Sequence, residues 1–162
     1  IMALTKLNNQ SLSAVTSAGI PIRSKSVLQV LNTVQTGTQG ISAAETFENI
    51  TGLTLDITPV STTSKILVWW SINYYMSSGY GITIVPIRNG TTRLYYNNHL
   101  RPFENYVGAG GMHGRISNQY LDSPATTSST TYQMQFAVSN TTSSSVGTDS
   151  FPMTLTLMEI AG

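Results

Sequence analysis

Hydrophobic and polar residues alternate along several stretches of this chain. The plainest alternation covers residues 132–138, and the same two-residue period returns in residues 53–58, 66–72 and 151–157. Side chains of a β-strand point to opposite faces in turn, so this period predicts strands with one buried face and one solvated face. Because segments rich in Ser, Thr, Asn and Gly separate these stretches, the sequence predicts an all-β fold of antiparallel sheets packed into a sandwich or barrel.

The pattern predicts about eight strands joined by long loops, an arrangement that fits a jelly-roll sandwich. The expected strands cover residues 27–34, 45–58, 66–75, 82–88, 91–96, 116–121, 131–139 and 151–160. Residues 97–115 are expected to form a loop, because glycines are frequent in their second half.

A hairpin is predicted where Asn89 and Gly90 separate residues 82–88 from residues 91–96. Asn and Gly both tolerate positive φ, which a type I′ turn requires at its two central positions. Pro86 lies inside the first of these strands and has no amide hydrogen to donate to a neighbour. We therefore expect that strand to lie at a sheet edge or to contain a bulge.

The strand predicted over residues 66–75 is apolar on both faces. Ile66, Val68, Trp70, Ile72 and Tyr74 share one face, and Leu67, Trp69 and Tyr75 share the other with Ser71 and Asn73. A sandwich sheet in a lone monomer normally leaves its outer face polar, so the second face needs cover. An N-terminal arm or a loop can supply that cover. The alternative that we favour is a subunit interface, because oligomers bury aromatic patches bounded by polar residues.

The composition is that of a neutral, hydroxyl-rich surface around a single core. The chain has 162 residues, the usual size of one domain, and only 9% are charged, against about a quarter in typical proteins. The formal charge is +1 and the eight cations are scattered singly, which argues against a nucleic-acid partner. The chain has no cysteine, so it has neither disulfides nor thiolate metal sites.

The first residues differ from the rest of the chain. Residues 2–24 are small, polar and weakly patterned, and we expect them to form an extended or short-helical attachment arm ahead of a head domain at residues 25–162. The basic-then-apolar layout of a signal peptide is not present, and no apolar run approaches the roughly 20 residues that cross a bilayer. We therefore expect neither secretory export nor membrane insertion.

No motif in the sequence announces an active site. His99 and His113 have no partner at metal-ligand spacing, and no Gly-x-Ser-x-Gly elbow presents a nucleophile. A glycosidase needs two carboxylates facing each other, and the sequence leaves open whether Glu104 and Asp122 meet in space. We predict a non-enzymatic protein that uses no cofactor and no metal ion.

Several short phrases resemble the structural proteins of tailed bacteriophages, especially marine and cyanobacterial ones. These phrases are residues 2–7, 26–30, 52–59, 64–68, 120–124 and 155–160. The resemblance implies a jelly roll of the tumour necrosis factor kind, usually a homotrimer, that is made in the host cytoplasm and displayed on the exterior of the virion. The expected role is a tail-fibre tip or receptor-binding module, or alternatively a capsid decoration or connector protein that contacts other virion proteins through residues 2–24.

Under the receptor-binding alternative, the expected ligand is a host-surface glycan bound by loops. Aromatic rings offer faces for sugar rings, and basic side chains donate to hydroxyl or acidic groups. The candidate ligand-binding residues are Tyr95, Tyr96, His99, Arg101, His113 and Arg115.

Overall fold

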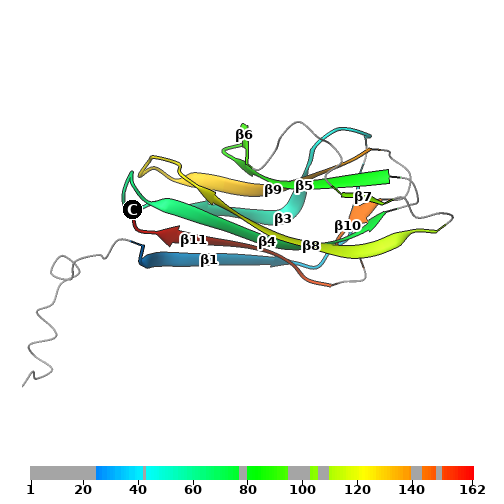
Figure 1. The fold of residues 1–162 in the computed structure, drawn as a ribbon, viewed down its shortest axis with the longest axis horizontal. Helices are drawn as coiled ribbons and strands as arrows, with labels where there is room; N and C mark the ends of the chain where they lie inside the picture. Colours follow the sequence, from blue (N-terminus) through cyan, green and yellow to red (C-terminus); the bar gives the residue numbers. More distant parts are fainter. Residues whose placement is uncertain are drawn as a thin grey trace, which may run out of the picture.

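The chain folds as two antiparallel β-sheets packed face to face, which confirms the all-β prediction (Figure 1). The computed structural model describes residues 25–41, 43–76, 80–94, 103–105, 110–139, 144–148 and 151–162. Its strands are β1 (Val27–Gln35), β2 (Gln39–Gly40), β3 (Glu48–Ile57), β4 (Lys65–Met76), β5 (Tyr80–Arg88), β6 (Thr92–Arg93), β7 (Phe103–Asn105), β8 (Met112–Asp122), β9 (Thr130–Val138), β10 (Ser145–Val146) and β11 (Met153–Ile160). The attachment arm predicted at residues 2–24 lies outside the described residues.

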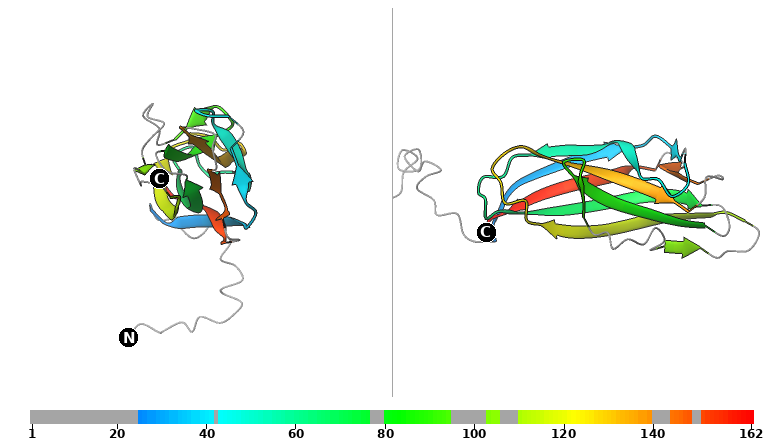
Figure 2. Two further views of the ribbon diagram at one scale, coloured as in Figure 1. Left: turned by 90° about the vertical axis from the view of Figure 1, so that its right-hand side faces the viewer. Right: turned by 90° about the horizontal axis from the view of Figure 1, so that it is seen from above.

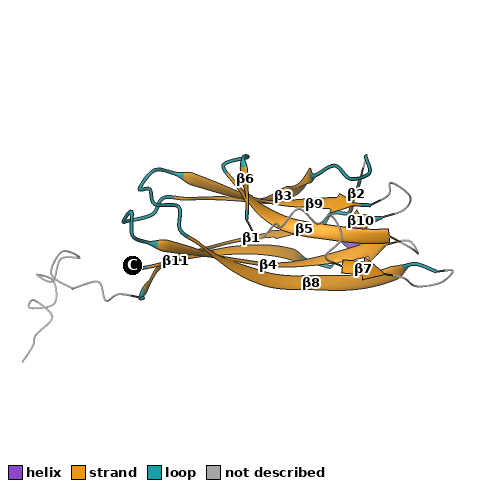
Figure 3. Ribbon diagram, turned by 45° about the horizontal axis from the view of Figure 1, so that its top comes forward, coloured by secondary structure: helices purple, strands orange, loops and turns teal. Residues whose placement is uncertain are grey.

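The central strand of the first sheet is β4. Strands β11 and β10 pair along one side of β4, β8 pairs along the other, and β1 and β2 extend the sheet beyond β11 and β10 respectively. The second sheet has the order β3-β9-β5-β6, and β7 also pairs with β5. Figures 2 and 3 show that the sandwich is elongated along the strand direction.

The two ends of the sandwich differ. Strand β1 begins where β11 finishes, and backbone bonds join them there: the amide of Lys25 donates to the carbonyl of Ala161, and the amide of Ala161 donates to the carbonyl of Ser26. We call this the proximal end. The opposite, distal end contains the end of β4 at Met76, the start of β8 at Met112 and strand β10 (Figure 1).

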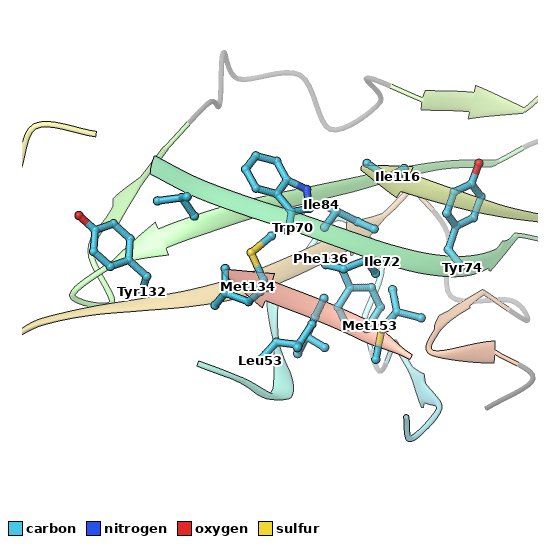
Figure 4. Close-up of a cluster of buried hydrophobic side chains, with 14 of the residues drawn as sticks. Leu53, Trp70, Ile72, Tyr74, Ile84, Ile116, Tyr132, Met134, Phe136 and Met153 are labelled. Carbon is cyan, nitrogen blue, oxygen red and sulfur yellow. The ribbon is translucent and has the colours of Figure 1, made fainter. Parts of the chain in front are cut away.

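The core lies between the sheets and is rich in large side chains. Leu53 of β3, Trp70 of β4 and Phe136 of β9 are fully buried there (Figure 4). The face of β4 that was predicted to be internal is buried throughout, from Ile66 to Tyr74. Trp70 is 1% exposed whereas Trp69 is 47% exposed, so Trp70 is the tryptophan that faces the core.

An ionic cluster joins the two sheets near the proximal end. Arg88 of β5 donates to both carboxylate oxygens of Asp122 of β8, at 2.8 and 2.7 Å. The hydroxyl of Tyr132 of β9 donates to Oδ2 of the same carboxylate at 2.6 Å. Burial raises the pKa of Tyr132, and the hydrogen bond to Asp122 raises it further, so the phenol stays protonated. We call these three residues the cross-sheet clamp.

A second buried acid ties β11 to the loop between β3 and β4. Glu159 is fully buried; it accepts a hydrogen bond from Gln29 of β1 at 2.6 Å and one from the amide of Val60 at 2.7 Å. Burial alone raises the pKa of Glu159, but hydrogen bonds to its carboxylate outweigh burial and hold the pKa below its ordinary value. Glu159 is therefore ionised in the folded protein at neutral pH.

The predicted hairpin is confirmed. Asn89 and Gly90 have φ of 49° and 68°, and the amide of Thr91 donates to the carbonyl of Arg88, as a type I′ turn requires. The second strand is shorter than predicted, because β6 covers only Thr92–Arg93.

The prediction that the strand containing Pro86 lies at an edge or contains a bulge is wrong, since β5 pairs with β9 on one side without a register shift and with β6 and β7 on the other. The carbonyl of Pro86 accepts from the amide of Leu94, on the side away from β9. The amide and carbonyl of one strand residue point to the same side, so the missing donor of Pro86 also faces away from β9. Among the described residues, β6 and β7 pair only with the two ends of β5 on that side, at residues 87–88 and 80–82, so the ladder there requires no amide from Pro86.

The predicted glycine-rich loop gives way to a strand earlier than expected. Strand β8 starts at Met112, so residues 112–115 are sheet rather than loop. A Cβ atom at Gly111 would overlap the ring of Tyr75, and one at Gly114 would overlap the ring of Tyr74. These two glycines make room for tyrosine rings from β4, which is a packing role that composition alone does not distinguish from a flexible loop.

Candidate functional site

Part of the face of the first sheet that points away from the core carries apolar side chains. Residues paired across antiparallel strands point to the same face, so the register defines rows of neighbouring side chains. The rows, read from β1 through β11 and β4 to β8, are Val30–Met158–Leu67–Leu121, then Asn32–Thr156–Trp69–Gln119, then Val34–Thr154–Ser71–Ser117. We call the apolar members of these rows, Val30, Val34, Leu67, Trp69, Leu121 and Met158, the apolar outer face.

The apolar outer face is open in the single chain. Val30 and Val34 are each 55% exposed, and Trp69 and Leu121 are each 47% exposed. Scattered exposed hydrophobics are ordinary, but a contiguous patch marks an interaction surface. On a chain whose other surface residues are mostly hydroxyl and amide side chains, this patch is the clearest candidate for an interface.

Two of the three predicted interface residues, Leu67 and Trp69, belong to the apolar outer face. The third, Tyr75, lies farther along β4 at the distal end, where its ring packs against that of His113 with centroids 4.9 Å apart. The prediction omitted Val30, Val34, Leu121 and Met158, because they lie in three other strands, β1, β8 and β11. Only the register of four strands shows that they adjoin Trp69.

Beyond the row that contains Ser71, the same face becomes polar and is hollowed. A hollow of about 500 Å³ lies near the distal end. It is lined by Asn73 of β4, His113, Gly114 and Arg115 of β8, and Thr148 and Phe151 from the segment before β11. We call this hollow the distal pocket. A neighbouring hollow of about 360 Å³ shares His113 and Thr148 with it.

The guanidinium of Arg115 is held across β4. Its Nη1 donates to the hydroxyl of Ser71 at 3.2 Å, and its Nη2 donates to the carbonyl of Pro152 at 2.9 Å. Arginine has five N–H donors, so these two bonds leave further donors for a ligand. Phe151 lies beside Pro152 and is 59% exposed, which is unusual for an aromatic ring at a pocket.

Asn73 is the buried polar residue of the distal pocket. It is 5% exposed, and its Nδ2 donates to the carbonyl of Thr148 at 2.5 Å and to the Thr148 hydroxyl at 3.3 Å. Its Oδ1 is buried and has no hydrogen-bond partner in the described part of the chain. Buried polar atoms are nearly always paired, so an oxygen left unpaired by the described residues is notable.

The structure brings together two of the six predicted ligand-binding residues. His113 and Arg115 both line the distal pocket, but they lie in strand β8 and not in a loop as predicted. The other four, Tyr95, Tyr96, His99 and Arg101, lie outside the described residues. The sequence analysis missed Asn73, Thr148 and Phe151, since none of them belongs to a motif and they meet only through the pairing of distant strands.

The described residues offer little to other chemistries. The carboxylate of Asp122 binds Arg88 and Tyr132 in the cross-sheet clamp, and the side chain of Glu104 lies outside the description. Across the described segments, no group of three or more His, Asp or Glu side chains is arranged to hold a metal ion. No helix in those segments is long and apolar enough to cross a membrane.

Comparison with known proteins assigns no function to the chain, so the apolar outer face and the distal pocket are the basis for a proposal. No protein-family model matches the chain, and no curated protein matches it.

Proposed function

We propose that this chain is a non-enzymatic structural protein of a virion exterior and that it self-associates through the apolar outer face. The observation that carries the proposal is that three strands contribute exposed hydrophobic side chains to one face: Val30 and Val34 from β1, Trp69 from β4 and Leu121 from β8. Between them, in the row that joins Val30 to Leu121, lie the half-buried side chains of Met158 and Leu67. The resemblance to tailed-phage proteins favours a homotrimer among the possible assemblies.

A second copy of the chain suits the apolar outer face because the row positions around its apolar side chains are uncharged; the guanidinium of Arg115 reaches the face only at Ser71, on its distal border. None of the positions in its three rows is Asp, Glu, Lys or Arg. Interface cores are depleted in charged residues and enriched in aromatic ones, and an uncharged face does not repel an identical one. Burial of apolar surface contributes roughly 25 cal/mol per Å², against which the costs of association must be set.

We further propose that the two sheets form a jelly roll. Successive long strands change sheet, from β3 to β4 to β5 and from β8 to β9 to β11, and the first and last strands pair with each other. This alternation is what a double Greek-key sandwich produces, and it supports the fold that the resemblance implies.

The arrangement of the ends favours a receptor-binding role, such as the tip of a tail fibre that recognises a host-surface glycan. Residues before Lys25 join the fold at the proximal end, where the amide of Lys25 bonds Ala161. The distal pocket lies near the opposite end. A module attached at one end and hollowed near the other presents its pocket away from the particle.

A decoration or connector protein, held to its neighbours through residues 2–24, is the second candidate. The attachment of that segment at the proximal end is the observation that favours it. Deletion of residues 2–22 separates the two roles. A receptor-binding module without these residues still binds host cells, whereas a connector without them fails to enter particles.

Self-association is tested with the double variant Trp69→Ser, Leu121→Ser, and with Val60→Ser as a matched control. Val60 is an exposed hydrophobic residue of the loop between β3 and β4, outside the apolar outer face. Light scattering and native mass spectrometry at micromolar concentration should show an oligomer for the wild type and the control, and a monomer for the double variant. A monomeric wild type would refute the proposal.

A further inference from the structure

We propose that the distal pocket binds one pyranose ring of a saccharide, with the apolar face of the sugar on Phe151 and its hydroxyl groups at Arg115 and Thr148. The proposal deepens the receptor-binding role proposed above and rests on it for the class of ligand. It assigns the site to strands β4 and β8 and to the segment before β11, whereas the sequence analysis expected loops.

The size and the walls of the pocket suit a single ring. Its volume of about 500 Å³ lies within the range of roughly 300–1,000 Å³ that ligand sites cover. Such sites are mostly apolar, with a few polar groups that fix orientation. Here Phe151 supplies an exposed aromatic surface, and Arg115, Thr148 and Asn73 supply the polar groups.

The aromatic ring is matched to one side of a sugar. A pyranose carries C–H bonds on one face and hydroxyl groups around its edge, so it can place an apolar face on an aromatic ring while its hydroxyls bond elsewhere. An aromatic side chain with one face free provides a rigid apolar surface at low entropic cost. Phe151 is 59% exposed beside the polar groups of the pocket, which is the pairing that such a ligand requires.

The polar groups are held in place before any ligand binds. Bonds to Ser71 and Pro152 fix the guanidinium of Arg115, and its remaining N–H groups can donate to hydroxyl oxygens. The hydroxyl of Thr148 accepts a bond from Asn73, so its own hydrogen remains able to donate. Groups that are already ordered lose less entropy when a ligand binds.

Asn73 is the positioning residue of this site. Its amide nitrogen holds the backbone and hydroxyl of Thr148, while its buried Oδ1 has no hydrogen-bond partner among the described residues. An unpaired buried oxygen destabilises the free protein, and a small adjustment that lets a ligand hydroxyl donate to it would remove that cost. Asn73 also lines the distal pocket, and its buried oxygen is an observation independent of the exposed ring.

Saturation-transfer NMR with single sugars tests the proposal. The probes are the methyl pyranosides of glucose, galactose and mannose, together with N-acetylglucosamine and glucuronic acid, each at about 20 mM so that millimolar affinities register. At least one probe is expected to bind the wild type, with transfer strongest at the ring C–H protons. Absence of transfer to all five probes would overturn the proposal.

Variants locate the binding. Phe151→Ala should lower the affinity for the bound probe at least tenfold. Phe151→Trp should restore that affinity, because only the aromatic face is needed. Val60→Ala is the matched control and should bind as the wild type does. Phe151 is largely exposed, so its variants should keep the melting temperature of the wild type. Unchanged binding by Phe151→Ala would overturn the proposal.

Asn73→Ala tests the positioning role separately. Asn73→Ala should lower the affinity for the probe. The decrease should be larger than the decrease caused by Thr148→Val, which removes only the hydroxyl. Light scattering on the same samples separates this inference from the proposed assembly. An oligomer that binds no probe refutes the distal pocket alone, whereas a monomer that binds a probe through Phe151 refutes self-association and supports the pocket.

Discussion

Replacing Asp122 with alanine should unfold the protein well below the wild-type melting temperature. Asp122 is 6% exposed, and its carboxylate is the acceptor for both Arg88 and Tyr132. These residues belong to β8, β5 and β9, so the cross-sheet clamp ties one sheet to the other. The truncation leaves a largely buried guanidinium and a buried phenol without an acceptor.

The magnitude follows from that burial. Removing one member of a buried ion pair costs about 3–5 kcal/mol, because the remaining charge loses its partner and stays desolvated. For a chain of this size, 1 kcal/mol changes the melting temperature by roughly 2–4 °C, so the expected decrease is about 6–20 °C. Asp122→Asn keeps an acceptor oxygen and should cost less, about 1–3 kcal/mol.

The assay is urea and thermal unfolding followed by circular dichroism, with all variants at one protein concentration because association changes apparent stability. Asp56→Ala is the control, since Asp56 is an exposed acid that accepts one bond from Thr131. It should cost less than about 1 kcal/mol. A double-mutant cycle between Asp122→Ala and Tyr132→Phe, each of which removes the bond between the two side chains, should show coupling above roughly 0.5 kcal/mol.

The reasoning would be refuted if Asp122→Ala and Asp56→Ala destabilised the protein equally. Additive free energies in the cycle would show that Tyr132 and Asp122 do not share a bond in solution. Either result would mean that apolar packing alone holds the two sheets together.

Three further predictions concern other parts of the fold. The pKa of Glu159 is lowered in the folded state, so the wild type should be more stable than Glu159→Gln. This stability difference, measured from urea midpoints, should be full above about pH 4.5 and should shrink as the pH falls further. A difference that stays constant with pH would contradict the lowered pKa. In a monomeric background, Trp70→Ala should lower the free energy of unfolding by about 3–5 kcal/mol, and Trp69→Ala should lower it by less than about 1 kcal/mol. The same assay measures both, and equal losses would contradict the faces assigned to the two tryptophans. Gly90→Ala should cost about 1–2 kcal/mol through its φ of 68° alone, because nothing lies near the added Cβ atom, and a neutral effect would argue against the type I′ turn.

The sequence predicted those parts of the fold that depend on local pattern. The two-residue period located the long strands, and alternation along β4 grouped Ile66 and Val68 on one face, which the structure shows to be the buried one. The Asn89–Gly90 dipeptide identified its hairpin because the turn depends on two residues only.

The sequence could not predict features that depend on pairing between distant strands. The short strands β2, β7 and β10 have no periodicity of their own: β7 and β10 pair with the longer strands β5 and β4, and β2 pairs with β10. The start of β8 was missed because Gly111 and Gly114 look like loop residues, although they accommodate the rings of Tyr75 and Tyr74.

The candidate site was only partly predictable for the same reason. Alternation singled out Leu67 and Trp69 as residues that need cover, but the rest of the apolar outer face comes from β1, β8 and β11. The distal pocket joins Asn73, Arg115 and Phe151, which are far apart in sequence. No periodicity or spacing relates residues that only the fold places side by side.

The pairing of β1 with β11 has a mechanical consequence. A particle that holds this module at Lys25 and a ligand near the distal end would pull along the strands, from one end of the sandwich to the other. Hydrogen bonds between antiparallel strands run perpendicular to the strands, so such a load shears all the bonds between β1 and β11 together instead of peeling them one by one. The geometry therefore favours resistance to tension in the direction in which a tethered adhesin is stretched.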